Sequence, residues 1–281
     1  MHVQIVDCTT ADAGDTFTRS LRETGFAVLR NHPIPAAVLE KLRDDWQAFF
    51  DSDNKFEFLV EQGVGESGHS GFFSTAMSET AVGYPAKDLK EFYHVIADGL
   101  VPPGCKDSTY EYRELGFELG RELMRWLSDA MPQDIVASLS EPLPGMMSED
   151  ASVFRILHYP PLDGSEAEQA VRAAAHEDIN LITLLPAANH PGLEVQDTAG
   201  NWHAVPCDPG TLVVNSGDML QEATGGYFPS TSHRVVNPGD DIANASRISA
   251  PLFLTARFDT VLSDRYTAGE YLDERLKIIS R

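Results

Sequence analysis

The sequence predicts a mainly β fold with flanking helices, in which a strand-rich barrel or sandwich follows a helix-rich part. After about residue 150, short runs rich in Val, Ile, Leu and Thr alternate with turns rich in Pro, Gly, Asn and Asp. Many short strands at regular spacing are typical of a sandwich or barrel. Because no Pro/Gly-rich linker separates the helix-rich part (1–150) from the strand-rich part with its terminal helix (151–281), we expect a single domain over 1–281.

The N-terminal part is expected to alternate helices with strands. Its expected elements are strands at 3–6 and 26–29, helices at 15–24, 35–50 and 108–131, and a loop at 63–74. Gly25 directly after the first helix and Pro35 at the start of the second are typical of helix ends and helix starts. The Gly/Ser-rich loop contains Phe72 and Phe73 and is expected to be either a lid or a plain surface loop.

The C-terminal part is expected to consist almost entirely of strands. They are expected at 152–159, 179–185, 192–196, 202–205, 211–214, 232–236 and 247–254, and a final helix at 267–279 closes the chain. We find no internal repeat in the sequence.

Composition excludes several classes of function. The 281 residues carry 43 acidic and 21 basic side chains, a net charge of −22 that argues against nucleic acid or an anionic membrane as a partner. Three scattered cysteines support neither a disulfide framework nor a cysteine-based zinc site. Residues 1–8 lack the features of a signal peptide, and no apolar stretch reaches the roughly 20 residues of a membrane helix. We therefore expect a cytoplasmic protein that acts on a small molecule.

Two histidines stand out from the nine because of their neighbours. His176 and Asp178 lie two residues apart at the start of an apolar strand, and side chains at this spacing project from the same face of a strand. His233 begins another expected strand. Two imidazoles and one carboxylate on one face of a metal ion are the arrangement expected for non-haem Fe(II) oxygenases.

A second group of residues has the chemistry to hold a carboxylate. Arg247 and Ser249 share the same two-residue spacing, and a guanidinium fork beside a hydroxyl suits a carboxylate. Tyr159 ends the expected strand 152–159 and could add a second hydroxyl.

The order of these motifs resembles the isopenicillin N synthase-like branch of the Fe(II)/2-oxoglutarate-dependent oxygenases. The resemblance covers nearly the whole chain and is carried by these segments: 24–32 (TGFAVLRNH), 155–161 (RILHYPP), 175–178 (AHED), 191–195 (PGLEV), 209–220 (PGTLVVNSGDML), 232–235 (SHRV) and 247–251 (RISAP). Two positions depart from the family pattern: Pro33 follows Asn31-His32 where the family usually has Gly, and Leu157 stands where plant members often have Asn.

The resemblance implies a double-stranded β-helix (jelly-roll) core. It implies Fe(II) bound by His176, Asp178 and His233. It also implies that the distal carboxylate of 2-oxoglutarate, the cosubstrate used together with O2, is bound by Arg247, Ser249 and Tyr159.

The activity implied is oxidation of a small molecule, by hydroxylation or desaturation, with release of succinate and CO2. Isopenicillin N synthase works without 2-oxoglutarate and the ethylene-forming member fragments it, so both chemistries stay open, as does a metal-free jelly roll that only binds a ligand.

Strand alternation places Phe253 in phase with Arg247 and Arg155 in phase with Tyr159. We expect these two residues in the substrate pocket, where Arg155 meets an anionic group or, alternatively, pairs with a neighbouring acidic residue.

Overall fold

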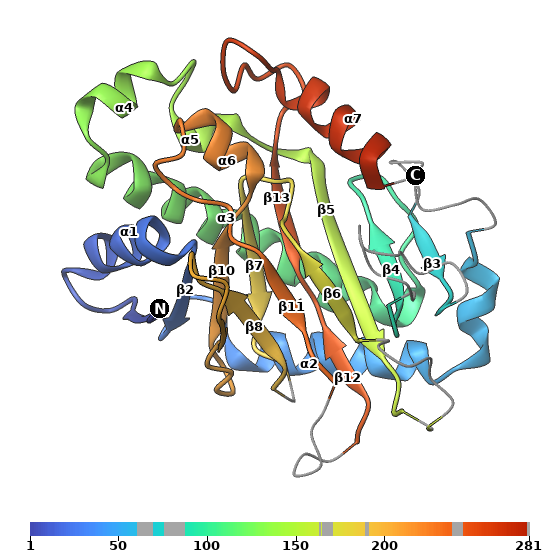
Figure 1. Cartoon of the computed structure of the whole chain (residues 1–281). Helices are drawn as coiled ribbons and strands as arrows, with labels where there is room; N and C mark the ends of the chain where they lie inside the picture. Colours follow the sequence, from blue (N-terminus) through green and yellow to red (C-terminus); the bar gives the residue numbers. More distant parts are fainter. Residues whose placement is uncertain are drawn as a thin grey trace.

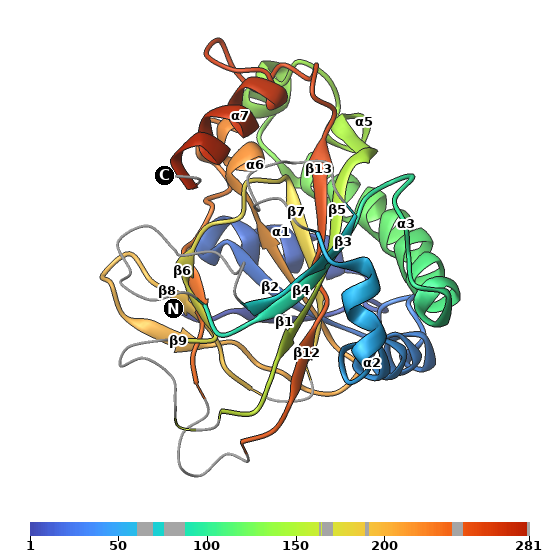
Figure 2. The same ribbon diagram turned by 90° about the vertical axis from the view of Figure 1, so that its right-hand side faces the viewer.

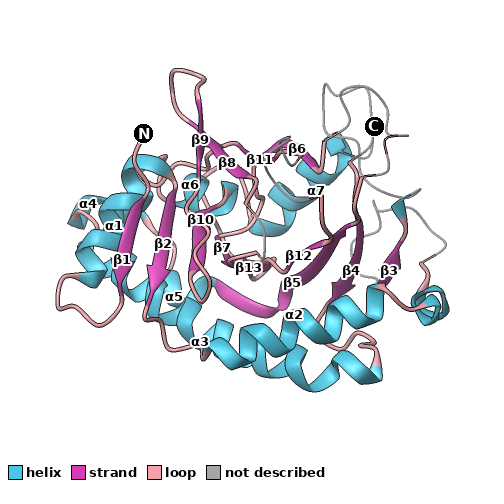
Figure 3. Ribbon diagram, turned by 90° about the horizontal axis from the view of Figure 1, so that it is seen from below, coloured by secondary structure: helices cyan, strands magenta, loops and turns pink. Residues whose placement is uncertain are grey.

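The chain folds into a helical layer and two facing sheets. The computed structural model describes residues 1–60, 70–75, 88–162, 164, 171–188, 191–237 and 244–279. Helices α2 (Ala36–Phe50) and α3 (Lys106–Ala130) cover the outer face of a large sheet, and a small sheet lies against its inner face (Figures 2 and 3).

The large sheet takes strands from both parts of the chain (Figure 1). In spatial order its strands are β1 (Gln4–Asp7), β2 (Phe26–Arg30), β10 (Leu212–Ser216), β7 (Ile182–Pro186), β13 (Leu252–Ala256), β5 (Met147–Tyr159), β4 (Glu91–Val95) and β3 (Gly71–Phe73), and β12 (Arg247–Ser249) pairs with the end of β5. Only the β1–β2 pair is parallel among the strand pairs of the described residues.

The small sheet has four strands and completes the jelly roll. Their order is β6 (Ala173–His176), β11 (His233–Val235), β8 (Leu193–Gln196) and β9 (Trp202–Ala204). The pairing of β11 with β6 changes register between His233 and Val235, which is a β-bulge or similar irregularity. A bulge re-aims the side chains that flank it.

Strand alternation divides the core into two clusters, one on each face of the large sheet. In β10, Leu212 and Val214 pack toward the helices, whereas Val213 packs between the sheets. In β2, Leu29 packs toward the helices and Val28 packs between the sheets. Side chains of successive strand residues point to opposite faces, so a buried strand must be apolar on both. The inter-sheet cluster encloses the candidate site.

Of the remaining helices, the first packs beside α3 and against β1 and β2. These helices are α1 (Ala13–Thr24), α4 (Gln133–Ser138), α5 (Leu143–Met146), α6 (Asp218–Ala223) and α7 (Ala268–Ile279), with 3-10 turns η1 (Asp53–Phe58) and η3 (Pro103–Cys105). α1 ends at Gly25 in a left-handed conformation (φ 71°), where a side chain would collide with Thr231 and the carbonyl oxygen of Pro229. Gly25 thus lets the chain before β11 pack closely. Within the described residues, no helix has the length and apolarity needed to cross a bilayer.

The structure confirms the mainly β class and corrects several boundaries. β3, β4 and β6 were not expected, and the expected strand 247–254 is two strands separated by Ala250 and Pro251. Phe72 and Phe73 are buried in β3, so they are not lid residues, and positions 63–69 of that expected loop lie outside the described residues. β4 was missed because Glu91 and His94 interrupt its apolar pattern.

Candidate metal centre and carboxylate site

Two side chains from neighbouring positions and a third from much later in the sequence converge between the sheets. His176, Asp178 and His233 each offer one ligand atom, and these three atoms lie within 4.8 Å of one another. The Oδ1 atom of Asp178 is 3.9 Å from Nε2 of His176 and 3.8 Å from Nε2 of His233. These separations are too long for hydrogen bonds but fit three ligands around one small cation.

Both imidazoles are held so that the same nitrogen faces the other ligands. His176 Nδ1 donates to the carbonyl oxygen of Ala174 at 2.8 Å, and His233 Nδ1 donates to that of Thr231 at 3.1 Å. A carbonyl can only accept, so Nδ1 carries the proton and Nε2 presents a lone pair. This is the orientation that metal-binding histidines require.

Asp178 is also oriented through one of its two oxygens. Its Oδ2 accepts hydrogen bonds from Thr183 Oγ1 (2.5 Å) and Asn215 Nδ2 (2.8 Å), which leaves Oδ1 for a cation. Burial alone would raise the pKa of Asp178, but the two neighbouring histidines and these two donors outweigh it and lower that pKa. The group is therefore ionised at neutral pH, as a metal ligand must be.

The site opens to solvent on one side. The His176 side chain is 43% exposed, against 6% for Asp178 and 10% for His233. Partial desolvation and the neighbouring His233 lower the pKa of His176, so its ring is neutral at physiological pH. A neutral ring binds a cation without first releasing a proton.

The local structure of the ligands differs from the strand geometry expected from their spacing. His176 ends β6, whereas Asp178 lies in the connection to β7. The prediction that both project from one face of a single strand is therefore wrong. Asp178 is held by the backbone instead, because its carbonyl oxygen accepts from the amide of Asp218 at the start of α6 at 2.7 Å.

Arg247, Ser249 and Tyr159 also lie together between the sheets. Arg247 is the register partner of Tyr159 across β12 and β5, and its guanidinium carbon is 5.2 Å from the centre of the Tyr159 ring. Ser249 pairs with Leu157 in the same ladder. All three side chains are almost fully buried, and Tyr159 packs in the same cluster as Val195, the register partner of His233. Arg247 also lines a small cavity with Cys207 and apolar side chains.

Arg155 and Phe253 meet on the same face of the large sheet. The guanidinium carbon of Arg155 is 5.8 Å from the ring centre of Phe253 and 4.9 Å from that of Phe92. Its Nε donates to His94 Nε2 at 2.6 Å. Phe92 and His94 come from the unexpected strand β4, which pairs with β5. The role of Arg155 and Phe253 in a substrate pocket stays a prediction.

Comparison with known proteins agrees with this geometry. The family model of the 2OG-Fe(II) oxygenase superfamily matches residues 151–256. A candidate 2OG-Fe(II) oxygenase family protein from Caulobacter crescentus is 32% identical over 99% of both chains, and its crystal structure superposes with a TM-score of 0.77. The chain belongs to the 2OG-Fe(II) oxygenase superfamily.

Two further relatives of this superfamily member add detail. The crystal structure of a candidate oxygenase from Shewanella oneidensis is 47% identical, covers 100% of this chain and 99% of that chain, and has a TM-score of 0.89. Feruloyl CoA ortho-hydroxylase 2 from Arabidopsis thaliana is 27% identical over 246 residues, which are 85% of this chain but 65% of the hydroxylase. The family identified from the sequence motifs is confirmed at the level of the superfamily.

Several residues of the site were missed in the sequence. Thr183 and Asn215, which orient Asp178, are buried polar residues inside apolar strands. A polar residue in such a strand is a usable signal, because a buried polar group needs a partner.

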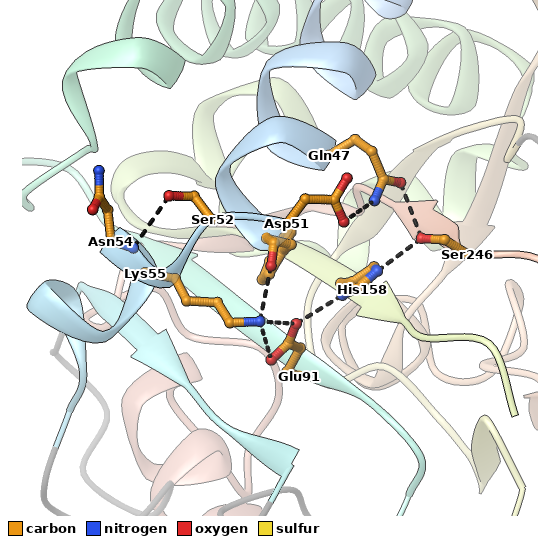
Figure 4. A network of polar contacts seen from close by, with 9 residues as sticks. Gln47, Asp51, Ser52, Asn54, Lys55, Glu91, His158 and Ser246 are labelled. Atoms are coloured by element: carbon orange, nitrogen blue, oxygen red, sulfur yellow. Dashed lines mark hydrogen bonds and ion pairs between the residues drawn. The ribbon is translucent and has the colours of Figure 1, made fainter. Parts of the chain in front are cut away.

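A buried ionic network supports the opposite face of the β5–β12 pair (Figure 4). His158 lies between Leu157 and Tyr159 in β5. Its Nδ1 is 2.7 Å from Glu91 Oε1, and its Nε2 is 2.7 Å from Ser246 Oγ. Lys55 Nζ donates to both oxygens of Glu91, at 2.9 and 3.1 Å. Burial alone would raise the pKa of Glu91, but the hydrogen bonds from His158 and Lys55 and the charge of Lys55 lower it.

We predict that Glu91→Gln destabilises the protein at pH 7 by about 3 kcal/mol, because it leaves buried donors without their anion. The lowered pKa means that the folded state gains stability from ionised Glu91 at pH values above 4.5, the usual value of a glutamate. That gain is lost as the pH falls through the folded-state pKa, so the difference between the wild type and the variant should shrink below pH 4.5. Urea unfolding at several pH values measures this.

The matched control is Glu149→Gln, which breaks an ion pair between Glu149 and Arg121. The Glu149 side chain is 55% exposed and the Arg121 side chain is 48% exposed. An exposed pair contributes at most about 1 kcal/mol. Equal losses in the two variants, or a Glu91→Gln deficit that does not change with pH, would contradict a stabilising role for the buried network.

Proposed function

We propose that this protein is an Fe(II)- and 2-oxoglutarate-dependent dioxygenase that hydroxylates or desaturates a small molecule. For hydroxylation the balance is 2-oxoglutarate + O2 + R–H giving succinate + CO2 + R–OH. The observation that carries the proposal is the atom-level orientation of three side chains: Nε2 of His176, Nε2 of His233 and Oδ1 of Asp178 converge while their other polar atoms are engaged elsewhere.

Each group of residues has a separate task in this proposal. His176, Asp178 and His233 would hold Fe(II), which when bound supplies the redox chemistry toward O2. Arg247, Ser249 and Tyr159 would bind the distal carboxylate of 2-oxoglutarate in a dry environment, where charge-assisted hydrogen bonds are strongest. The apolar inter-sheet cluster keeps bulk water away from the reacting groups.

Two supports come from the wider molecule. One sheet joins strands from 1–150 and 151–256, which supports the inference that residues 1–281 act as a single oxygenase domain. Cys8, Cys105 and Cys207 form no disulfide, which supports the inferred cytoplasmic location, where thiols stay reduced.

A metabolite screen tests the proposal. The purified protein with Fe(II), ascorbate and 2-oxoglutarate is given candidate small molecules, and succinate is measured with and without each. The proposal expects succinate to rise with one class of molecule in equimolar amount with its oxidised product. Oxidation without succinate would favour an oxidase of the isopenicillin N synthase type, and ethylene would favour 2-oxoglutarate fragmentation. Failure to bind Fe(II) would favour a metal-free jelly roll that only binds a ligand.

Arg155→Ala is expected to raise the Michaelis constant of the substrate found in this screen by roughly tenfold or more, since it removes a charged partner from the pocket. The turnover number and the Michaelis constants of substrate and 2-oxoglutarate are measured separately. Arg234→Ala is the control, because Arg234 pairs with Glu194 on β11 and β8 and packs on Trp202. If all three constants of Arg155→Ala match the wild type, Arg155 has no role in ligand binding.

A further inference from the structure

Two arginine side chains are buried against the same tyrosine ring. The guanidinium carbon of Arg247 is 5.2 Å from the ring centre of Tyr159, and that of Arg172 is 5.9 Å from it. Each arginine is 2% exposed. The family resemblance accounts for Arg247 and leaves Arg172 without a role.

The polar contacts of Arg172 do not neutralise its charge. Its Nη2 donates to the carbonyl oxygen of Ala245 at 2.9 Å, two residues before Arg247. Its Nε is buried and has no hydrogen-bond partner, and no carboxylate of the described residues forms an ion pair with it. Burial and the positive charge of Arg247 both lower the pKa of Arg172.

A buried cation without an anion is costly, and a second cation nearby raises that cost. An arrangement of this kind is stable only if other interactions compensate it, and it becomes favourable when an anion binds. Arg172 also precedes β6, the strand that ends at the proposed metal ligand His176. One short segment therefore connects the proposed metal centre to the carboxylate site.

We propose that Arg172 is a second positively charged group of the carboxylate site and determines its preference for a ligand with a distal carboxylate. Arg247 and Tyr159 would bind that carboxylate, and Arg172 would add its charge and its unpartnered Nε–H from the neighbouring segment. This inference rests on the proposed function, since the ligand concerned is 2-oxoglutarate.

The test changes the protein and the ligand together. Calorimetry measures the Kd of 2-oxoglutarate and of 2-oxobutyrate, which has the same 2-oxo acid end but no distal carboxylate, for protein loaded with Mn(II) in place of Fe(II). We expect Arg172→Gln to raise the Kd of 2-oxoglutarate by roughly 10- to 100-fold, as for loss of a hydrogen bond to a charged group. The Kd of 2-oxobutyrate should stay unchanged. The ratio of the two constants should fall by the same factor.

Two further variants control for packing and folding. Arg113→Gln removes another buried arginine with an unpartnered Nε, which lies on α3 against Phe117 and away from the site, and should keep the ratio. Arg172→Lys keeps the charge but not the planar fork, so its ratio should fall less than that of Arg172→Gln. If Arg172→Gln does not fold, a reduced ratio in Arg172→Lys still supports the inference and an unchanged one overturns it.

The outcomes separate the two proposals. An unchanged ratio in folded Arg172→Gln overturns the role of Arg172 and leaves the proposed function intact. A wild-type protein that binds 2-oxoglutarate no better than 2-oxobutyrate overturns the proposed use of 2-oxoglutarate and this inference with it. Weakening of both ligands to the same degree shows collapse of the pocket and also overturns the specificity role.

Discussion

His233→Ala is expected to abolish oxidation and to weaken Fe(II) binding by more than about 100-fold. Loss of groups that merely orient metal ligands already costs 10- to 100-fold in affinity, so loss of a ligand costs at least as much. The variant loses the contact between the His233 ring and the Phe26 ring, whose centres are 5.4 Å apart. The fold should survive this loss, because His233 is not part of the helical core. Equilibrium dialysis with anaerobic Fe(II) and a thermal melt of the metal-free protein measure the two effects.

His203→Ala provides the matched comparison. His203 lies on β9 of the same small sheet, and its Nε2 is 2.7 Å from Asp197 Oδ2. This variant should bind one Fe(II) per chain like the wild type. Equal Fe(II) affinity in the two alanine variants would remove His233 from the proposed metal centre.

Arg247→Met is expected to raise the Kd of 2-oxoglutarate by about 30-fold or more. Truncating one partner of a buried, hydrogen-bonded charge pair costs at least about 2 kcal/mol. Fe(II) binding should change little, because Arg247 lies on β12 and is not among the three converging ligand groups. The absorbance that develops when 2-oxoglutarate binds to the anaerobic Fe(II) protein gives the constant.

Arg234→Met controls for the loss of an arginine near the site. Arg234 lies between His233 and Val235, so its side chain leaves the opposite face of β11, where it pairs with Glu194. The affinity of the Arg234→Met variant for 2-oxoglutarate should match that of the wild type. If Arg247→Met also binds 2-oxoglutarate normally, the carboxylate lies elsewhere in the fold.

The parts of the fold that could be predicted are those whose patterns are local. β2 and β10 each begin with an apolar run, 26–29 and 212–214, and α1 and α3 carry apolar residues at helical spacing. β4 contains Glu91 and His94, whose polarity is compensated by Lys55, His158 and Arg155 from other elements. Such long-range compensation leaves no mark on the local pattern.

The candidate site shows the same division. The spacing of His176 and Asp178 drew attention to a metal centre, although the geometry inferred from it was wrong, because the backbone of α6 and the side chains of Thr183 and Asn215 orient Asp178. The role of Arg172 depends on its distance from Tyr159, which only the tertiary structure supplies. The ligand assignments themselves stay predictions.

The most direct test of the metal centre is an anomalous diffraction measurement at the iron edge on crystals grown or soaked anaerobically with Fe(II). We predict one strong peak per chain, within coordination distance of Nε2 of His176, Oδ1 of Asp178 and Nε2 of His233. A peak bound by other side chains, or crystals that take up iron without any peak between these three atoms, would contradict the account.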